Sequence, residues 1–375
     1  MYRIGITGIT GFIGWHVRCR LYNHKDIEII PANRQTFQTE HSLNEFVKQC
    51  DGIVHLAGLN HGEDSEIKKV NVGLANALIK AMEHTDTFPN VVYASSTHIY
   101  KDTAYGRSKH IAGKLFSDCA KRHGARFTNL ILPHIFGEGG RPFYNSAVST
   151  FCHQLAIGET PQIDIDGQLE LLHVQDVAVM ILNALLQEGE SETINPSGHL
   201  MPVSELLFYL ETFQRLYVED KTFPHFQNRF HVQLFNTFRS YLFPEFYPVP
   251  LKLHTDDRGA LVEAVKSFHG GQAFFSTTKP GITRGNHFHF GKIERFLVVA
   301  GKGIIRLRRL FNDSIHEFHV SGDVPSYIDI PSLYTHNITN CGHEEMLTLF
   351  WSHEIFDPLN LDTYPEIVEK QDNPL

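Results

Sequence analysis

The sequence predicts an α/β domain built on a parallel sheet, followed by a smaller all-β domain. Short apolar strands alternate with amphipathic helices up to about residue 195, and a glycine-rich turn follows the first strand. From Leu251 onward, short β-prone runs are separated by Gly, Pro, Asn and Asp, which is typical of an antiparallel barrel or sandwich. A chain of 375 residues is long enough for two domains, which we expect at residues 1–246 and 247–375.

The predicted elements follow one another in a regular order. In the first domain we expect strands at residues 2–7, 27–31, 52–57, 90–95 and 128–133, with helices at 15–22, 43–49, 68–82 and 108–123. Residues 203–243 are rich in aromatic side chains at helical spacing, and Pro244, Pro248 and Pro250 mark the end of this helical part. In the second domain we expect strands at 273–278, 294–300, 303–310, 315–320, 327–330 and 346–351.

The composition excludes several classes of function. Hydrophobic residues make up 42% of the chain and charged residues 20%, as in ordinary globular proteins. A net charge of −9 argues against a broad nucleic-acid or acidic-membrane surface. The N-terminus does not resemble a signal peptide, no apolar run is long enough to span a bilayer, and the five cysteines form no CxxC pair. We therefore expect a cytoplasmic protein with no nucleic-acid or membrane partner.

A GxxGxxG turn between the first strand and the first helix predicts a dinucleotide site of the Rossmann type. Glycines at these positions let the backbone approach a pyrophosphate, and the helix N-terminus supplies N–H donors. The predicted cofactor contacts in this turn are Gly8, Thr10, Gly11, Phe12, Ile13 and Gly14. After the second strand stands Asn33-Arg34, where an acidic residue would bind the ribose of NAD. Because an arginine pairs with a 2′-phosphate, the sequence favours NADPH.

A candidate catalytic set follows the fourth strand. Tyr105 and Lys109 lie four residues apart and share one face of a helix, so that the lysine charge can tune the phenol for proton transfer. Nine residues upstream, at the end of a strand, stands Ser95-Ser96-Thr97, where a hydroxyl can hold the same carbonyl oxygen. A hydroxyl, a phenol and a lysine in this arrangement predict reduction of a carbonyl or oxidation of an alcohol.

These motifs together resemble the extended short-chain dehydrogenase/reductase family, as do His55-Leu-Ala-Gly58, Asn71 and the segment His173-Val-Gln-Asp-Val177. The resemblance implies that Ser96 is the catalytic hydroxyl, and that the cofactor is also contacted by Leu56, Ala57, Gly58, Asn71, Tyr105 and Lys109. It further implies a substrate pocket after Pro133, with candidate contacts at Thr97, His134, Arg141 and Asn145. Members of this family commonly act on nucleotide-linked sugars.

The second domain contains the segment Gly281-x5-His287-x-His289-x4-Glu294-x6-Gly301, followed later by His336. In a strand, His287 and His289 point to the same face, and Glu294 can face them across a hairpin. Three imidazoles and a carboxylate predict a site for zinc or another divalent transition metal. The spacing resembles the cupin family, although Leu333 stands where its second motif usually has glycine.

Further segments resemble sugar-active cupins. Asp256-Asp-Arg258-Gly and Arg284-Gly-Asn-His287 are similar to segments of dTDP-4-dehydrorhamnose 3,5-epimerases, which makes Arg258 and Arg284 candidate substrate contacts. The context of Arg284, with the tail Glu354-Ile-Phe-Asp357-Pro358, also resembles dTDP-sugar 3,4-ketoisomerases. Either resemblance implies action on a keto-sugar.

The fusion of the two domain types resembles the bifunctional capsular polysaccharide enzymes. That resemblance implies C3 epimerisation of a UDP-2-acetamido-2,6-dideoxy-4-keto-hexose by the cupin, then NADPH reduction at C4 to a talo-configured or related sugar. It also implies a homodimer, since both families often dimerise. Two alternatives stay open. In one, the chain is a 4-ketoreductase whose cupin is a 3,4-ketoisomerase or a dimerisation module; in the other, it is a non-catalytic NADP-binding protein.

Overall fold

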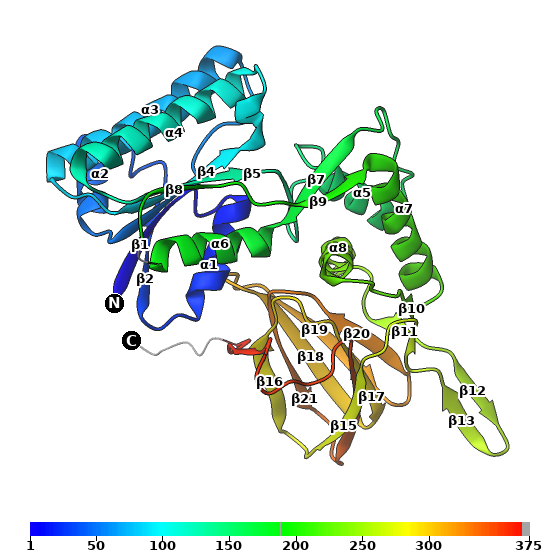
Figure 1. Ribbon diagram of the computed structural model, residues 1–375. Coiled ribbons are helices and arrows are strands. Elements are labelled where there is room, and N and C mark those ends of the chain that lie inside the picture. The colour runs from blue at the N-terminus through cyan, green and yellow to red at the C-terminus, as the bar shows by residue number, and fades with distance from the viewer. Residues whose placement is uncertain (188, 370–375) are drawn as a thin grey trace. The chain divides into compact units, whose positions relative to one another are not determined.

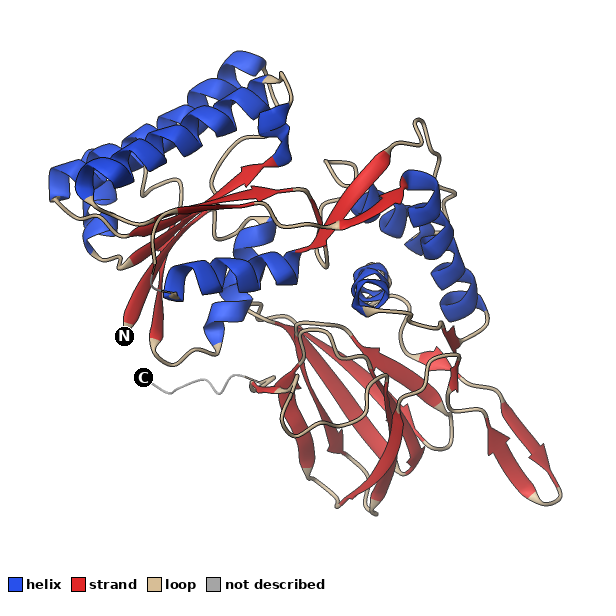
Figure 2. Cartoon of the chain, viewed as in Figure 1, coloured by secondary structure: helices blue, strands red, loops and turns tan. Residues whose placement is uncertain are grey.

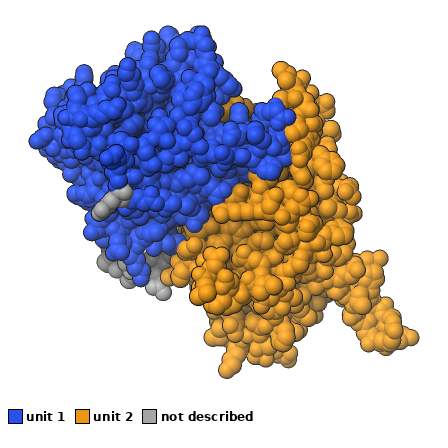
Figure 3. Space-filling model, in the orientation of Figure 1, with its two compact units in different colours: residues 1–136, 168–201 blue, residues 137–167, 202–375 orange. Residues whose placement is uncertain are grey.

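The computed structural model describes residues 1–187 and 189–369. The chain divides into two compact units, one comprising residues 1–136 and 168–201 and the other residues 137–167 and 202–375 (Figure 3). Each unit is described by itself. The predicted domain boundary after residue 246 stays a prediction.

The first unit is a three-layer α/β structure (Figures 1 and 2). Its parallel sheet has the order β2-β1-β3-β4-β5-β8, and these strands are β1 (Tyr2–Thr7), β2 (Ile27–Ala32), β3 (Gly52–His55), β4 (Asn90–Ser96), β5 (Phe127–Leu132) and β8 (Glu192–Ile194). A second, three-stranded sheet comprises β6 (His134–Phe136), β7 (Gln168–His173) and β9 (His199–Pro202).

Helices cover both faces of the six-stranded sheet. One face carries α1 (Phe12–Tyr22) and α6 (Val174–Leu186), and the other carries α2 (Glu40–Lys48), α3 (Asp64–Thr85) and α4 (Ala104–His123) (Figure 1). Val17, Leu130 and Ile181 lie in the core on the first side, while Leu78 and Phe116 lie in the core on the second. The central strands are buried on both faces, so their sequences are almost continuously apolar. This is why short apolar runs between predicted helices marked them as strands.

The strand order reverses direction at β1, which has β2 on one side and β3 on the other. At such a switch point the connections leave in opposite directions, and a crevice opens at the carboxyl ends of the two strands. The glycine turn follows β1, and residues 56–58 follow β3. The fold therefore brings two of the predicted cofactor segments to the same edge of the sheet.

The second unit combines helices with antiparallel strands. Its helices are α5 (Ala147–Ala156), α7 (Val203–Phe213), the π-helical η2 (Gln214–Glu219) and α8 (Arg229–Ser240). One five-stranded sheet comprises β11 (Val249–Pro250), β20 (Ser326–Ile330), β17 (Glu294–Ala300), β22 (Met346–Ser352) and β15 (Gln272–Thr278). The other comprises β19 (Ile315–Ser321), β18 (Lys302–Arg309), β21 (Tyr334–Asn340), β16 (Thr283–Phe288) and β23 (Tyr364–Pro365).

Apolar side chains from both sheets form one core, which includes Phe296, Ile305, Ile338 and Phe350. The buried Arg295 guanidinium binds both Asp329 carboxylate oxygens at 2.7 and 2.8 Å. Tyr217 on η2 donates a hydrogen bond of 2.6 Å to the same carboxylate, so the π-helical turn is fastened to β20. A buried ion pair is tolerated when further hydrogen bonds satisfy its remaining polar atoms, as here.

The prediction of a parallel α/β domain followed by an antiparallel β domain is confirmed. We call the two five-stranded antiparallel sheets of the second unit the β domain. Strands β16 and β21 and the hairpin of β12 (Leu253–Asp256) and β13 (Gly259–Val262) were not among the predicted runs. The first two are largely polar in sequence, and the two hairpin strands are only four residues long each. A short parallel pair, β10 (Thr222–Phe223) with β14 (Lys266–Ser267), was also not predicted. Within the described residues, none of the helices is long and apolar enough to cross a bilayer.

Candidate functional site

The glycine turn after β1 presents bare backbone. Gly8 has φ +72°, a conformation that favours glycine, and its carbonyl accepts a hydrogen bond of 2.9 Å from the Gly11 N–H. A Cβ at Gly14 would lie 2.2 Å from the Gly8 oxygen, so only glycine lets α1 pack this close to the turn. The helix begins at Phe12, and the N–H groups of its first turn form an anion-binding end.

Thr7, at the end of β1, was not predicted from the sequence. Its Oγ1 accepts hydrogen bonds of 3.1 Å from the N–H groups of both Leu56 and Ala57, and its one proton then goes to His55 Nδ1 at 2.9 Å. Burial, together with the charge of Lys109, lowers the pKa of His55 to about 3, so this imidazole is neutral. Thr7 therefore fixes the chain after β3 beside the glycine turn.

Asn71 on α3 shapes the same crevice indirectly. Its Oδ1 accepts from the Leu59 N–H at 2.7 Å, and its Nδ2 donates to the Leu59 carbonyl and to Ser108 Oγ at 2.8 and 2.9 Å. A Cβ at Gly58 would lie 2.9 Å from Asn71 Oδ1. The predicted cofactor residue Asn71 is thus buried and holds the loop at residues 56–59 in place.

The two residues predicted to select the cofactor behave differently. The Asn33 Oδ1 accepts from the N–H groups of Gln35 and Thr36 at 2.8 and 3.2 Å and closes the turn after β2. Arg34 is exposed, and none of the described residues pairs with its guanidinium. Arg34 is therefore the one that is available to an anion.

The start of α4 positions the predicted catalytic pair. Thr103 caps the helix by accepting a hydrogen bond from the Gly106 N–H at 3.0 Å, which places Tyr105 in the first turn and Lys109 one turn later. Lys109 Nζ is buried, donates to the Ala94 carbonyl at 2.8 Å and lies 5.8 Å from the centre of the Tyr105 ring. Burial lowers the pKa of Lys109 to about 8, because the charged form loses its hydration.

Ser96 ends β4 and begins η1 (Thr97–Tyr100), where its Oγ accepts from the His98 N–H at 3.3 Å. A Cβ at Gly106 would lie 2.0 Å from the His98 carbonyl oxygen, so glycine in the YGRSK segment lets η1 pack directly on the first turn of α4. The segment that follows Ser96 therefore packs on the turn that carries Tyr105.

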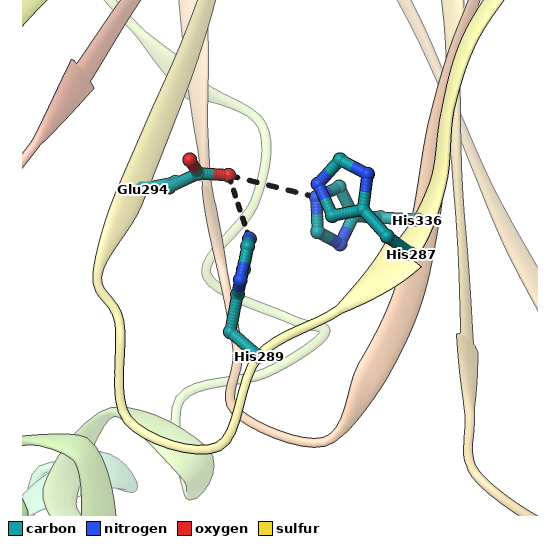
Figure 4. A group of neighbouring side chains, drawn as sticks. All are labelled: His287, His289, Glu294 and His336. Atoms are coloured by element: carbon teal, nitrogen blue, oxygen red, sulfur yellow. Dashed lines mark hydrogen bonds and ion pairs between the residues drawn. The ribbon is translucent and has the colours of Figure 1, made fainter. Parts of the chain in front are cut away.

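The four predicted metal ligands come together between the two β-sheets (Figure 4). His287 on β16 faces His336 on β21 in register, and Glu294 begins β17 in the other sheet. One ligand atom from each of the four side chains lies within 4.8 Å of all the others. His289 Nε2 lies 2.9 Å and His336 Nε2 3.6 Å from Glu294 Oε2.

The expectation that His287 and His289 share one strand is wrong, because β16 ends at Phe288. The chain turns there because the Asp362 carboxylate accepts hydrogen bonds from the N–H groups of Phe290, Gly291 and Lys292, all between 2.7 and 2.8 Å. Asp362 was not predicted as a site residue, although it lies in the tail that resembles sugar-active cupins. Its backbone carbonyl also binds His289 Nδ1 and directs Nε2 at the cluster.

The cluster has the donor chemistry of a transition-metal site. His336 Nε2 is buried and has no hydrogen-bond partner in the described chain, while its Nδ1 lies 3.2 Å from the Tyr334 carbonyl. Burial and the imidazoles of His336 and His289 lower the pKa of His287 to about 3, which keeps it in the neutral, metal-binding form. A divalent cation would satisfy the orphaned nitrogen and the Glu294 carboxylate together, so the residues fit such an ion.

The structure places the predicted substrate contacts in several environments. His134 lies exposed on β6; Arg141 stacks at 5.1 Å on the Tyr144 ring, and the exposed Asn145 precedes α5. Arg284 on β16 donates to Thr278 Oγ1 and the Thr277 carbonyl at 3.1 and 2.9 Å. Arg258 lies at the tip of the β12–β13 hairpin, which pairs with no other strand in the described chain and projects from the sheets (Figure 1), so the structure does not bring Arg258 to the cluster.

A cavity of about 400 Å³ in the second unit was not predicted. It lies between α5 and residues 162–165, and its lining includes Phe151, Gln154, Gln162 and Asp164. Amide and carboxylate groups beside an aromatic ring suit a flat polar ligand.

The parallel sheet and the glycine turn at its switch point define the first unit as a Rossmann-type domain. The chain belongs to the NAD dependent epimerase/dehydratase family, whose model matches residues 4–195. The model of the polysaccharide biosynthesis C-terminal domain matches residues 254–364.

Two relatives match almost the whole chain. The UDP-2-acetamido-2,6-beta-L-arabino-hexul-4-ose reductase of Pseudomonas aeruginosa is 30% identical over 96% of this chain and 98% of its own. The crystal structure of the capsular polysaccharide assembling protein CapF from Staphylococcus aureus covers 97% of this chain and 100% of its own, with 35% identity and a TM-score of 0.64. A UDP-N-acetylglucosamine 4-epimerase from Bacillus cereus shares the fold over 57% of this chain and 82% of its own, at 24% identity and a TM-score of 0.51.

Proposed function

We propose that the first unit reduces the C4 ketone of a UDP-2-acetamido-2,6-dideoxy-4-keto-hexose with NADPH, and that the β domain epimerises C3 of the same sugar. The observation that carries the proposal is the buried Lys109 ammonium, which is held by the Ala94 carbonyl beside the Tyr105 ring. The full-length similarity to a reductase of such a UDP-sugar supports the substrate class.

The residues divide the work of the reduction. The glycine turn would hold NADPH, which when bound would supply the hydride for the ketone carbon. Tyr105 donates its phenolic proton to the ketone oxygen, and Ser96 Oγ orients that oxygen by a hydrogen bond. Lys109 stabilises the phenolate that remains on Tyr105, because its charge lies in a buried, weakly screened place.

The cofactor is held by backbone and by one cation. The turn at residues 8–14 receives the pyrophosphate, and Thr7 and Asn71 keep residues 56–59 in place along the cofactor. Arg34 pairs with the 2′-phosphate, which distinguishes NADPH from NADH.

Within the second unit, the cavity beside α5 is our candidate for a uracil site. Gln154, Gln162 and Asp164 offer donors and acceptors for the imide edge of the base, and Phe151 offers an aromatic face. Arg141 and Asn145, which lie exposed just before α5, stay our candidate contacts for the diphosphate.

For the epimerisation, His287, His289, Glu294 and His336 would hold zinc or another divalent transition metal. The hydrogen on C3 of a 4-keto sugar is acidic because its removal gives an enolate conjugated with the ketone. A divalent ion in this cluster supplies positive charge that polarises a carbonyl. Because His287 is then a ligand, its imidazole is not the free base.

The test is NADPH oxidation, followed at 340 nm, with enzymatically prepared UDP-2-acetamido-2,6-dideoxy-4-keto-hexose. We expect turnover with the UDP-linked sugar and a C4 alcohol in the NMR spectrum of the product. The proposal fails if the protein oxidises no NADPH on this substrate under conditions where it binds NADPH.

A further inference from the structure

The imidazole of His98 lies beside Tyr105, the imidazole of His134 lies beside His98, and neither has a task in the reduction chemistry described above. The His98 ring meets the Tyr105 ring edge to face, with centroids 5.7 Å apart and planes at 75°. The His134 ring lies 6.4 Å beyond, again edge to face with His98. The row Tyr105–His98–His134 therefore extends from the phenol that meets the ketone.

His98 is held by its backbone between the two catalytic side chains. Its N–H donates to Ser96 Oγ at 3.3 Å, and its carbonyl accepts from the Lys101 N–H at 2.9 Å. The same carbonyl oxygen packs on Gly106, next to Tyr105, where a Cβ would lie 2.0 Å away. The backbone of His98 is thus held in place by η1 and α4, and its ring lies against Tyr105.

The polar atoms of both rings are available. In residues 1–187 and 189–369, neither ring nitrogen of His98 or His134 forms a hydrogen bond, and both side chains are accessible to solvent. Burial and the nearby Lys101 lower the pKa of His98, which keeps its ring neutral near pH 7. A neutral imidazole carries one donor and one acceptor, a combination that suits a hydroxyl group.

We propose that His98 binds the hydroxyl group on the carbon next to the ketone, with His134 as the second imidazole beside it, and thereby selects the C3 epimer that is reduced. The inference rests on the proposed reduction of a 4-keto sugar. A carbonyl carbon and its neighbour are one bond apart, and the His98 ring is in contact with the Tyr105 ring. The first unit would then bind preferentially the C3 configuration that the β domain produces.

The test compares the 3-hydroxy substrate with its 3-deoxy analogue in the full chain. We expect the wild type to prefer the 3-hydroxy sugar by at least about tenfold in kcat/KM, because the analogue leaves the imidazole without a partner. His98→Phe keeps the ring contact with Tyr105 but removes the nitrogens, so this preference should fall to about onefold, mainly through KM for the 3-hydroxy sugar. His98→Gln should restore part of it.

His110→Phe, an exposed histidine on α4, is the matched control and should keep the full preference. NADPH affinity, measured by fluorescence, should stay within about twofold of wild type in His98→Phe, which shows that the variant is folded. The inference is overturned if His98→Phe retains the wild-type preference, or if its loss is confined to kcat with both substrates alike. The failure of the proposed function is a different result, namely no turnover of either sugar by the wild type.

Discussion

The two candidate sites of this chain treat buried charge in opposite ways. In the Rossmann-type unit, Lys109 is buried with a backbone carbonyl as its polar contact, and no described carboxylate pairs with it. In the β domain, the buried Glu294 carboxylate lies beside His289, His336 and Lys292, and its Oε1 is 2.7 Å from Lys292 Nζ. The first arrangement leaves a cation whose charge acts on Tyr105, whereas the second gathers ligands around one point, as a bound ion requires.

The difference also has a chemical meaning. An uncompensated cation stabilises an anion that appears during a reaction, so it suits proton transfer by Tyr105. A group of imidazoles around a carboxylate suits a permanent, positively charged partner such as a metal ion. We therefore expect a substitution in one site to leave the activity of the other site unchanged. The predictions below test this independence, from the largest expected effect to the smallest.

The largest effect is expected for Tyr105→Phe. Loss of the phenolic proton should lower kcat for NADPH oxidation about a thousandfold. Exchange of the C3 hydrogen in deuterium oxide, followed by NMR, should stay at the wild-type rate because it belongs to the β domain. Tyr22→Phe, at the exposed end of α1, serves as the control. Loss of both activities in Tyr105→Phe would contradict the separation of the two sites.

The second effect concerns Glu294→Gln, which keeps the shape of the side chain and removes its charge. We expect metal affinity to fall about a hundredfold or more, measured by competition with a chromophoric chelator, and C3 exchange to fall with it. NADPH oxidation on the already epimerised sugar should be unaffected. Glu317→Gln, on the exposed face of β19, should bind metal as the wild type does. An unchanged metal affinity in Glu294→Gln would show that these residues do not hold the ion.

The third effect is on the cofactor. Arg34→Ala should reduce the preference for NADPH over NADH about tenfold in kcat/KM, which corresponds to the loss of one charge-assisted hydrogen bond. Lys48→Ala on α2 removes a comparable exposed charge outside the turn and should change neither value. If the wild type used NADPH and NADH equally well, Arg34 would not be the residue that selects the cofactor.

The smallest effect is a pH dependence. Burial depresses the pKa of Lys109 to about 8, so the ammonium is present below that value and is lost as the pH rises through it. Reduction needs this charge, and kcat/KM should therefore fall to about half its plateau near pH 8 and decline further above it. Lys109→Arg, which stays charged, should have lower activity but no such decline. A wild-type profile that is flat to pH 10 would contradict this role for Lys109.

The sequence predicted those parts of the molecule whose pattern is local. The apolar runs of the parallel strands, the glycine turn and the spacing of Tyr105 and Lys109 each lie within a few consecutive residues. The glycine turn follows β1 and the Tyr105 segment follows β4, two strands of the same parallel sheet. The metal-ligand pattern was visible because His287, His289 and Glu294 are close in sequence.

Other parts depend on contacts between segments far apart in the chain. Thr7 meets Leu56 only because β1 and β3 pair, and Asn71 meets Leu59 only because α3 returns over the sheet. Asp362 ends β16 from the tail of the chain, so the turn that separates His287 from His289 was not predictable from their own spacing. The contact of His98 with Tyr105 likewise requires η1 to pack on α4.

The most direct test of the account is the reaction in deuterium oxide with NADPH and the UDP-linked 4-keto sugar. The account predicts a C4 alcohol that carries deuterium at C3 for the wild type, and deuterated but unreduced sugar for Tyr105→Phe. A C4 alcohol without deuterium at C3, formed by a wild type that holds its metal, would contradict the proposal that both domains act on one sugar.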